Sequence, residues 1–247
     1  MTGPSKATIL IHGYAFDHRI WYPVELAFEN HHVIYLALPG FGMDPVTEAY
    51  TVSGLAKKYW QHLDEIGVEE INLAGHSMGG YVSIEMVAQQ PKRVSSLALV
   101  HSHVFADSDE KKQGRTQTLA DIKANGASAF ANKLITSLFA DIPKSSDLIG
   151  VLVARGLQHD DNAWYFGTKA MLERSDHANT LKNIRVPVLM LMGESDKAVP
   201  AELAYKQAAL AEQAVLHVYP DVGHLGMYEN TRQMIVDLIR FYDALPE

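Results

Sequence analysis

The stretch from Ile71 to Gly80 constrains the fold of this 247-residue chain more than any other. It reads Ile-Asn-Leu-Ala-Gly-His-Ser-Met-Gly-Gly, a short and mainly apolar run typical of a buried strand, closed by glycines. From Tyr81 to Gln89 apolar residues recur with helical spacing, so the chain must turn from strand to helix at Ser77. We expect a strained backbone there, which requires residues without side chains two positions before and after the serine.

A serine between a strand and a helix in the pattern Gly-x-Ser-x-Gly is typical of a nucleophile elbow. Such a turn lifts the Ser77 hydroxyl above the sheet and places the N–H of Met78 at a helix N-terminus, where negative charge is favoured. Glycine and serine are also common in ordinary turns, so the pentapeptide alone leaves a simple connection open. The inward residues expected on the helix include Val82, Met86 and Ala88.

The rest of the chain alternates between predicted strands and helices. Mainly apolar runs bounded by turn residues predict strands at residues 6–11, 32–38, 71–74, 94–100, 186–192 and 214–219. Helical periodicity predicts helices at residues 24–29, 52–66, 81–89, 201–211 and 231–245. This alternation indicates an α/β fold: a mostly parallel sheet of about six strands, here all expected to be parallel, with helices on both faces.

The alternation stops between residues 103 and 179, where no convincing strand pattern occurs. Four helical segments fill the stretch, at residues 109–124, 127–139, 147–157 and 162–174. The sequence therefore predicts an α/β core, residues 1–102 and 180–247, with an inserted helical cap at residues 103–179. Such a cap lies over the carboxyl ends of the strands, where α/β sheets bind ligands.

Composition narrows the classes of partner. The formal charge of -8 disfavours nucleic acid and anionic membranes. The absence of cysteine excludes disulfides, thiolate nucleophiles and cysteine-ligated metals. Residues Met1 to Lys6 lack a signal-peptide pattern, and no apolar run reaches the length of a membrane span. We expect a soluble, cytoplasmic protein that needs no metal and no cofactor.

Two polar residues follow the last two predicted strands, at the same edge of the sheet as Ser77. Asp196 follows the strand at residues 186–192, and His224 follows the strand at residues 214–219. A serine hydroxyl becomes a nucleophile when a base lies within hydrogen-bond reach and a carboxylate orients that base. The sequence therefore predicts a catalytic triad of these three residues.

Two other carboxylates, Glu194 and Asp221, lie near Asp196 and His224 and compete for the role of the acid. Asp221 is better suited to a turn. The earlier strand, at residues 94–100, has no carboxylate directly after it, so we do not expect the acid there. The histidines interpreted as surface or core residues are His31, His32, His62, His159 and His177.

The loop after the first strand, His12-Gly13-Tyr14, offers part of an oxyanion hole. Gly13 permits a tight turn, and the backbone N–H of Tyr14 can act together with that of Met78. Each such donor lowers the barrier by roughly 3 kcal/mol. A plain turn at the end of the strand is the alternative for this loop.

Five motifs, taken in order, resemble those of the α/β-hydrolase superfamily. They are His12-Gly13, Leu38-Pro39-Gly40-Phe41-Gly42, Gly75-His76-Ser77-Met78-Gly79, Gly193-Glu194-Ser195-Asp196 and Gly223-His224. The set covers nearly the whole chain and is most similar to small bacterial carboxylesterases and enol-lactone hydrolases with a four-helix cap. The resemblance implies that Ser77 is the nucleophile, His224 the base and Asp196 the acid. It also implies that the N–H groups of Tyr14 and Met78 form the oxyanion hole.

The resemblance implies a serine hydrolase that cleaves carboxylic esters of small to medium size through an acyl-enzyme, with a small-molecule ester or lactone as its partner. Lactone and enol-lactone hydrolases, carbon–carbon bond hydrolases and cofactor-free perhydrolases share the triad and stay open. Serine at position 77 argues against epoxide hydrolase and haloalkane dehalogenase chemistry, and a ligand receptor on a hydrolase fold is the non-enzyme alternative. The sequence does not predict an oligomeric state. The apolar residues expected to line the pocket are Phe130, Leu134, Leu138, Trp164 and Met171.

Overall fold

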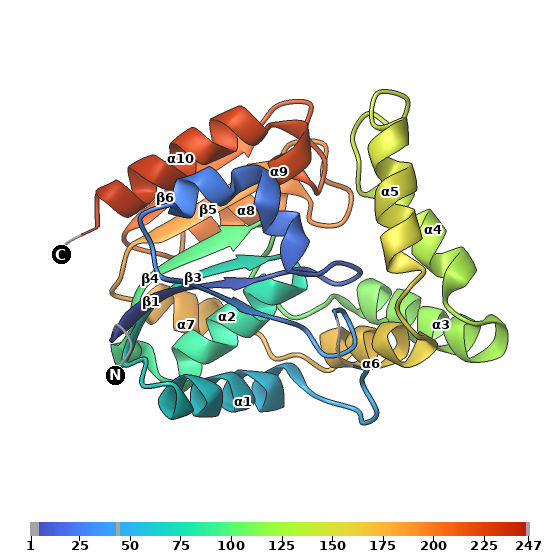
Figure 1. The fold of residues 1–247 in the computed structure, drawn as a ribbon, viewed down its shortest axis with the longest axis horizontal. Coiled ribbons are helices and arrows are strands. Elements are labelled where there is room, and N and C mark those ends of the chain that lie inside the picture. Colours follow the sequence, from blue (N-terminus) through green and yellow to red (C-terminus); the bar gives the residue numbers. More distant parts are fainter. Residues whose placement is uncertain (1–4, 43–44, 246–247) are drawn as a thin grey trace.

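Six parallel strands form one sheet in the computed structural model, which describes residues 5–42 and 45–245 (Figure 1). The strand order is β2-β1-β3-β4-β5-β6, and every neighbouring pair is parallel. The bounds are β1 Lys6–Ile11, β2 Val33–Leu36, β3 Glu70–His76, β4 Val94–Val100, β5 Val188–Gly193 and β6 Ala214–Tyr219. The prediction of about six strands, all parallel, is confirmed. The prediction on the N-terminal segment concerns residues 1–4 in part, and these lie outside the described residues.

The core of the sheet is formed by β1, β3, β4 and β5, which are buried along almost their whole length. Strands covered by helices on both faces read as continuous apolar runs, which is why the sequence pattern located them well. Strand β1 lies inside the sheet, with β2 on one side of it and β3 on the other. This arrangement opens a crevice at the carboxyl ends of β1 and β3, where α/β folds bind ligands.

Helices cover both faces of the sheet (Figure 1). One face carries α1 (Val52–Glu65), α2 (Met78–Gln89), α7 (Ala178–Asn183) and α8 (Ala201–Ala208), while the other carries η1 (His18–Phe28), α9 (Gly226–Glu229) and α10 (Thr231–Asp243). Within the described ranges, no helix combines the length and the apolar character that crossing a lipid bilayer requires.

The four helices predicted between β4 and β5 are present. They are α3 Asp109–Asn125, α4 Ser128–Ser137, α5 Ser146–Gly156 and α6 Asp161–Leu172. They gather beyond the carboxyl ends of the strands, with α3 packed against α6 and α4 against α5 (Figure 1). Every residue from 101 to 187 is described, and none of them lies in a strand. The stretch therefore adds only helices, at the edge of the sheet to which Ser77 belongs.

Three details differ from the prediction. The helix before the second strand is the 3₁₀ helix η1, which begins at His18; the carboxylate of Asp17 caps it by accepting the N–H of Arg19 at 2.9 Å, and Pro23 inside it disfavours an α-helix. The short helices α7 and α9, of six and four residues, are too short to show a period. Ala88, predicted to face inward, is exposed near the end of α2.

Candidate active site

The turn between β3 and α2 holds Ser77 in a strained conformation, as predicted. Its φ of 50° and ψ of -116° form a combination that residues other than glycine rarely adopt. A Cβ on Gly75 would lie 2.5 Å from the backbone of Gly79, and a Cβ on Gly79 would overlap the carbonyl oxygen of Ile11. The backbone thus excludes side chains two residues before and after Ser77, which confirms the predicted reason for the glycines.

His224 and Asp196 form a buried pair in the loops after β6 and β5. Nδ1 of His224 donates to Oδ2 of Asp196 at 2.7 Å, and the two side chains are 3% and 0% exposed. The second carboxylate oxygen, Oδ1, accepts the backbone N–H groups of Ala198 at 2.8 Å and Val199 at 2.9 Å. Because a carboxylate only accepts, the proton of neutral His224 sits on Nδ1, and Nε2 on the other side of the ring is left as a base.

Asp196 is charged in spite of its burial. Burial by itself raises the pKa of this carboxyl, but the electrostatic attraction to the ring of His224 and the contacts with His101 and His224 outweigh it and hold the pKa far below its ordinary value. The two backbone donors also favour the charged form. A charged Asp196 both orients His224 and stabilises a positive charge that forms on its ring.

The loop that carries His224 is fixed from two sides. The backbone N–H of His224 donates to the carbonyl of Leu138, at the end of α4, at 2.7 Å. Its own carbonyl accepts the Nε2–H of His76, the residue before Ser77, at 3.0 Å. Ser77 and His224 line the same cavity. The structure therefore brings the three predicted residues, Ser77, Asp196 and His224, to one edge of the sheet. Of the two alternative acids, Glu194 is exposed, and Asp221 occupies an exposed turn with a φ of 57°.

The loop after β1 lies beside the serine. His12 ties it down, since its Nε2 accepts the N–H of Leu38 at 3.0 Å and its Nδ1–H donates to the carbonyl of Gly13 at 2.9 Å. Burial keeps this histidine uncharged by lowering its pKa to about 4. A Cβ on Gly13 would overlap the ring of His76 and lie 3.1 Å from Cβ of Ser77. Glycine is thus required for this close approach.

The side chain of Tyr14 joins the same loop to α6. Its hydroxyl donates to the carbonyl of Trp164 and is hydrogen-bonded to Oγ1 of Thr168, each at 2.8 Å. The indole of Trp164 is 1% exposed and packs edge-on against Tyr14, Phe41 and Phe130. Trp164 was predicted to line the pocket, but it lies outside the cavity lining, and its large apolar ring is enclosed by Tyr14, Phe41 and Phe130 instead.

A cavity of about 270 Å³ lies between this edge of the sheet and helices α3, α4 and α6. Ser77 and His224 line it on the side of the sheet. The other predicted pocket residues line it from α4 and α6: Phe130, Leu134, Leu138 and Met171. Sequence analysis missed three basic lining residues, Lys111 and Arg115 of α3 and Lys197 of the loop after β5. The cavity is close in size to the smaller ligand pockets of proteins.

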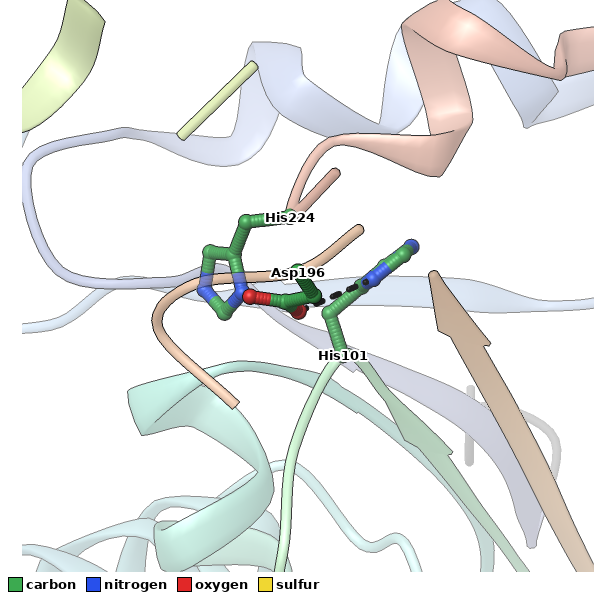
Figure 2. A group of neighbouring side chains, drawn as sticks. All are labelled: His101, Asp196 and His224. Carbon is green, nitrogen blue, oxygen red and sulfur yellow. Dashed lines mark hydrogen bonds and ion pairs between the residues drawn. The ribbon is translucent and has the colours of Figure 1, made fainter. Parts of the chain in front are cut away.

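A second histidine, His101, approaches Asp196 from the end of β4 (Figure 2). Its Nδ1 lies 3.4 Å from Oδ2 of Asp196, and its side chain is fully buried. Its Nε2 accepts the N–H of Gly226 at 3.1 Å. Sequence analysis did not single out His101, because it follows a strand that carries no acid. The pairing of β4 with β5 in the folded sheet is what brings it beside Asp196.

Among the described residues, His101, Asp196 and His224 could hold a metal, since one ligand atom from each lies within 4.8 Å of the others. The hydrogen bonds indicate another role. Because Nε2 of His101 accepts a hydrogen bond from the backbone N–H of Gly226, the ring proton of His101 sits on Nδ1, and Nδ1 of His224 is a donor as well. A ring nitrogen must lose its proton before it can bind a metal, so the arrangement present fits a hydrogen-bonded network around one carboxylate.

Known proteins resemble this chain over almost its whole length. The family model described as alpha/beta hydrolase fold matches residues 7–231. A pimeloyl-[acyl-carrier protein] methyl ester esterase from Pseudoalteromonas atlantica is 26% identical, over 96% of this chain and 94% of that protein. A thermophilic esterase from Thermogutta terrifontis has a TM-score of 0.83 at 24% identity, over 94% of this chain and 89% of its own. The enol-lactonase from Burkholderia xenovorans has a TM-score of 0.88 at 19% identity, over 98% and 92%. At these identities the two structures establish the fold alone.

Proposed function

The chain belongs to the α/β-hydrolase family, and on that premise we propose that it is a serine hydrolase that cleaves carboxylic esters of small to medium size. The observation that carries the proposal is that Ser77, held in a strained turn, lines the same cavity as His224, whose Nδ1 is bound by the buried carboxylate of Asp196. Backbone strain of this kind is costly and is typical of functional sites. The relatives named as esterases support an ester as the substrate.

In the proposed reaction, Oγ of Ser77 attacks the ester carbonyl while Nε2 of His224 takes the proton of the Ser77 hydroxyl. The bond to the alcohol oxygen then breaks, and His224 gives the proton to the departing alcohol, which leaves an acyl group on Ser77. Water attacks this acyl-enzyme as His224 takes a proton from it, and the carboxylic acid is released with the serine restored. Asp196 stays charged throughout and stabilises the protonated ring.

Two backbone N–H groups are proposed to bind the oxyanion that forms on the carbonyl oxygen. Met78 is the first residue of α2, so its N–H lies at the positive end of the helix dipole. Tyr14 lies in the loop that Gly13 brings against Ser77. Donors preorganised in this way act on the charge of the transition state and contribute roughly 3 kcal/mol each.

Residues 103–179 are proposed to act as a cap on a core formed by residues 1–102 and 180–247. The cavity supports this division, because its lining comes from the sheet edge on one side and from α3, α4 and α6 on the other. A lactone or enol-lactone hydrolase is the second candidate, since an enol-lactonase is among the proteins that share this fold. Cleavage of a cyclic ester uses the same proposed residues, and the new carboxylate and the new hydroxyl group stay on one product molecule.

The proposed function is tested with purified protein and p-nitrophenyl acetate, butyrate and octanoate, together with a panel of lactones. We expect at least one of these esters to turn over, and Ser77→Ala to lower kcat by about 10⁴-fold or more. Ser53→Ala, which removes an exposed serine of α1, is the matched control and keeps the wild-type rate.

The outcomes separate the alternatives. Faster cleavage of lactones than of open esters favours the second candidate. Equal and measurable rates for the wild type and Ser77→Ala overturn the assignment of the nucleophile. Absence of turnover on both panels, with tight binding of an ester, favours a ligand receptor on the same fold.

A further inference from the structure

One wall of the cavity carries positive charge. Lys111, Arg115 and Thr118 of α3 line it, and their spacing of four and three residues places them on one face of the helix. Lys197, next to Asp196 in the loop after β5, lines the same cavity. Among the described residues that line it there is no Asp or Glu. In a protein with a formal charge of -8, this wall does not follow from overall composition.

The charges around this wall do not cancel. The carboxylate of Asp107 accepts from Nε of Arg115 at 2.5 Å and from Arg174 at 2.7 Å, so one buried anion serves two guanidinium groups. These contacts more than offset its burial and lower the pKa of Asp107 to about 2. Arg115 donates to Asp107 through Nε, and the terminal nitrogens of a guanidinium held in this way can still donate to a second acceptor. The wall therefore keeps a net positive charge.

Lys111 connects the wall to the proposed catalytic loop. Its Nζ donates to the carbonyl of Ala198 at 2.8 Å, and the N–H of Ala198 donates to Oδ1 of Asp196. Burial, followed by the charge of Arg115, lowers the pKa of Lys111, which is the effect expected of a cation next to other cations. The ammonium is thus held at the cavity, near the residues proposed to cleave the ester.

The walls formed by α4 and α6 are mainly apolar, although Ser137 and Thr168 also line the cavity there. Phe130, Leu134 and Leu138 from α4 and Met171 from α6 face a site whose basic residues come from α3 and from the loop after β5. An apolar pocket with a few convergent charged groups binds a ligand in one orientation. A ligand that matches these walls has an apolar stem and one anionic end.

We propose that the substrate is an ester that also carries a carboxylate, bound by Arg115, Lys111 and Lys197 while the ester carbonyl lies at Ser77. This inference rests on the proposed function, which it narrows to a class of substrate. A carboxylate accepts two hydrogen bonds from a guanidinium, and such charge-assisted bonds are about twice as strong as neutral ones. The positive wall also attracts an anionic ester into the site more strongly than a neutral one.

The test compares methyl esters that differ in the charge of the far end. Monomethyl glutarate and monomethyl adipate carry a carboxylate, while their dimethyl esters and methyl hexanoate do not. We expect the release of methanol at pH 7 to show a kcat/KM at least about tenfold higher for the half-esters, with most of the difference in KM. A carboxylate on the alcohol side is tested with 4-acetoxybutanoate against pentyl acetate. The preference falls as salt is added, because salt screens the charges.

Substitutions locate the source of the preference. Arg115→Gln, Lys111→Gln and Lys197→Gln are each expected to reduce the ratio of half-ester to neutral ester by about threefold or more. Lys112→Gln is the matched control, because it removes the same charge from the same helix at an exposed residue outside the cavity lining. Lys197 is exposed and separate from Asp107, so its variant still reports if Arg115→Gln fails to fold.

Binding of glutarate to Ser77→Ala, measured by calorimetry, separates this inference from the proposed function. Equal kcat/KM for charged and neutral esters overturns the inference and leaves the esterase in place. Absence of ester cleavage, with glutarate bound by Ser77→Ala and bound more weakly by the double variant with Lys197→Gln, supports the anion site and overturns the esterase. Inorganic phosphate that displaces glutarate at equal concentration overturns the assignment to carboxylates.

Discussion

His101 and His224 direct their Nδ1 atoms at one carboxylate oxygen, Oδ2 of Asp196, at 3.4 and 2.7 Å (Figure 2). The shorter contact is a good hydrogen bond, whereas 3.4 Å is long for one, so His101 acts mainly through its electrostatic attraction to the carboxylate. Burial lowers the pKa of His101 and keeps it neutral, while the acceptor role of its Nε2 fixes the proton on Nδ1. His101, although neutral, therefore interacts with the same carboxylate oxygen that orients His224.

Substitution of His101 is expected to change the pH profile as well as the rate. In His101→Ala, His224 is the one histidine left beside Oδ2 of Asp196, and the carboxylate attracts the positive charge that forms on its ring more strongly. The acid limb of the kcat/KM profile should therefore move to higher pH, with a fall in kcat of about tenfold as the carboxylate loses one support. His101→Gln keeps a side-chain donor and should recover part of both effects. A fall in rate with an unchanged profile in both variants means that His101 only packs.

The strands and the proposed catalytic residues could be predicted because their signals are local. A parallel strand buried on both faces is an apolar run, and β1, β4 and β6 were predicted to the residue. Ser77 was found through its neighbouring glycines, and His224 and Asp196 through their places after strands. His101 carries no such signal, since its relation to Asp196 arises from the pairing of β4 with β5, which are separated in the sequence by a long helical stretch.

The walls of the cavity were predicted less well, for a physical reason. An apolar stripe on a helix does not distinguish packing from pocket, so Trp164 was expected beside Phe130 although it packs behind it. In α3 only Ile122 is buried, so no stripe indicated which face meets the cavity. The positions of Lys111 and Arg115 depend on how α3 lies against α6, which is a tertiary property.

The glycines around Ser77 give a direct test of the elbow. Gly79→Ala places a Cβ on the carbonyl oxygen of Ile11, a backbone atom that cannot move without disturbing β1. We expect a loss of more than about 3 kcal/mol in the free energy of unfolding by urea, or failure to fold. Gly150→Ala is the control: a Cβ there meets nothing within 4 Å inside α5, so it should stabilise the protein by about 0.5–1 kcal/mol. Equal effects of the two changes contradict the steric explanation.

Glu229 links the helices beyond the sheet to the loop of His224. Its Oε1 accepts the N–H of Ala140, just after α4, at 2.8 Å, and its Oε2 accepts the N–H of Gly223 at 2.9 Å. Glu229→Ala leaves two backbone donors without this acceptor, so both segments should loosen. We expect faster hydrogen exchange at these two amides and a fall in kcat/KM of about tenfold.

Glu229→Gln refines this test, because its amide offers one acceptor oxygen and can replace the carboxylate on one side only. Protection should return at either Ala140 or Gly223 but not at both. Glu202→Gln, which changes an exposed residue of the first turn of α8, is the matched control and should leave both amides protected. Loss of protection at neither amide in Glu229→Ala contradicts the proposed link.

The stability of the fold should fall between neutral and mildly acidic pH because of its buried histidines. His12 has a pKa of about 4 in the folded protein against 6.5 for an ordinary histidine, so between these values the unfolded chain binds more protons. Stability is therefore full above pH 6.5 and is lost as the pH falls toward 4. For this residue the loss between pH 7 and pH 5 is about 2 kcal/mol. Burial lowers the pKa of His76, His101 and His103 too, which adds to the loss with the same sign.

Urea unfolding at pH 7 and pH 5 measures this dependence. The carboxylates with lowered pKa values, such as Asp17 and Asp107, lose their contribution mainly below pH 4 and do not interfere in this range. His12→Gln should lower stability at pH 7, since the hydrogen bonds to Leu38 and Gly13 are disturbed, but its loss between pH 7 and pH 5 should be smaller than that of the wild type. His62→Gln, an exposed histidine of α1, should leave the loss unchanged. A loss in His12→Gln equal to that of the wild type means that His12 is not held neutral by the fold.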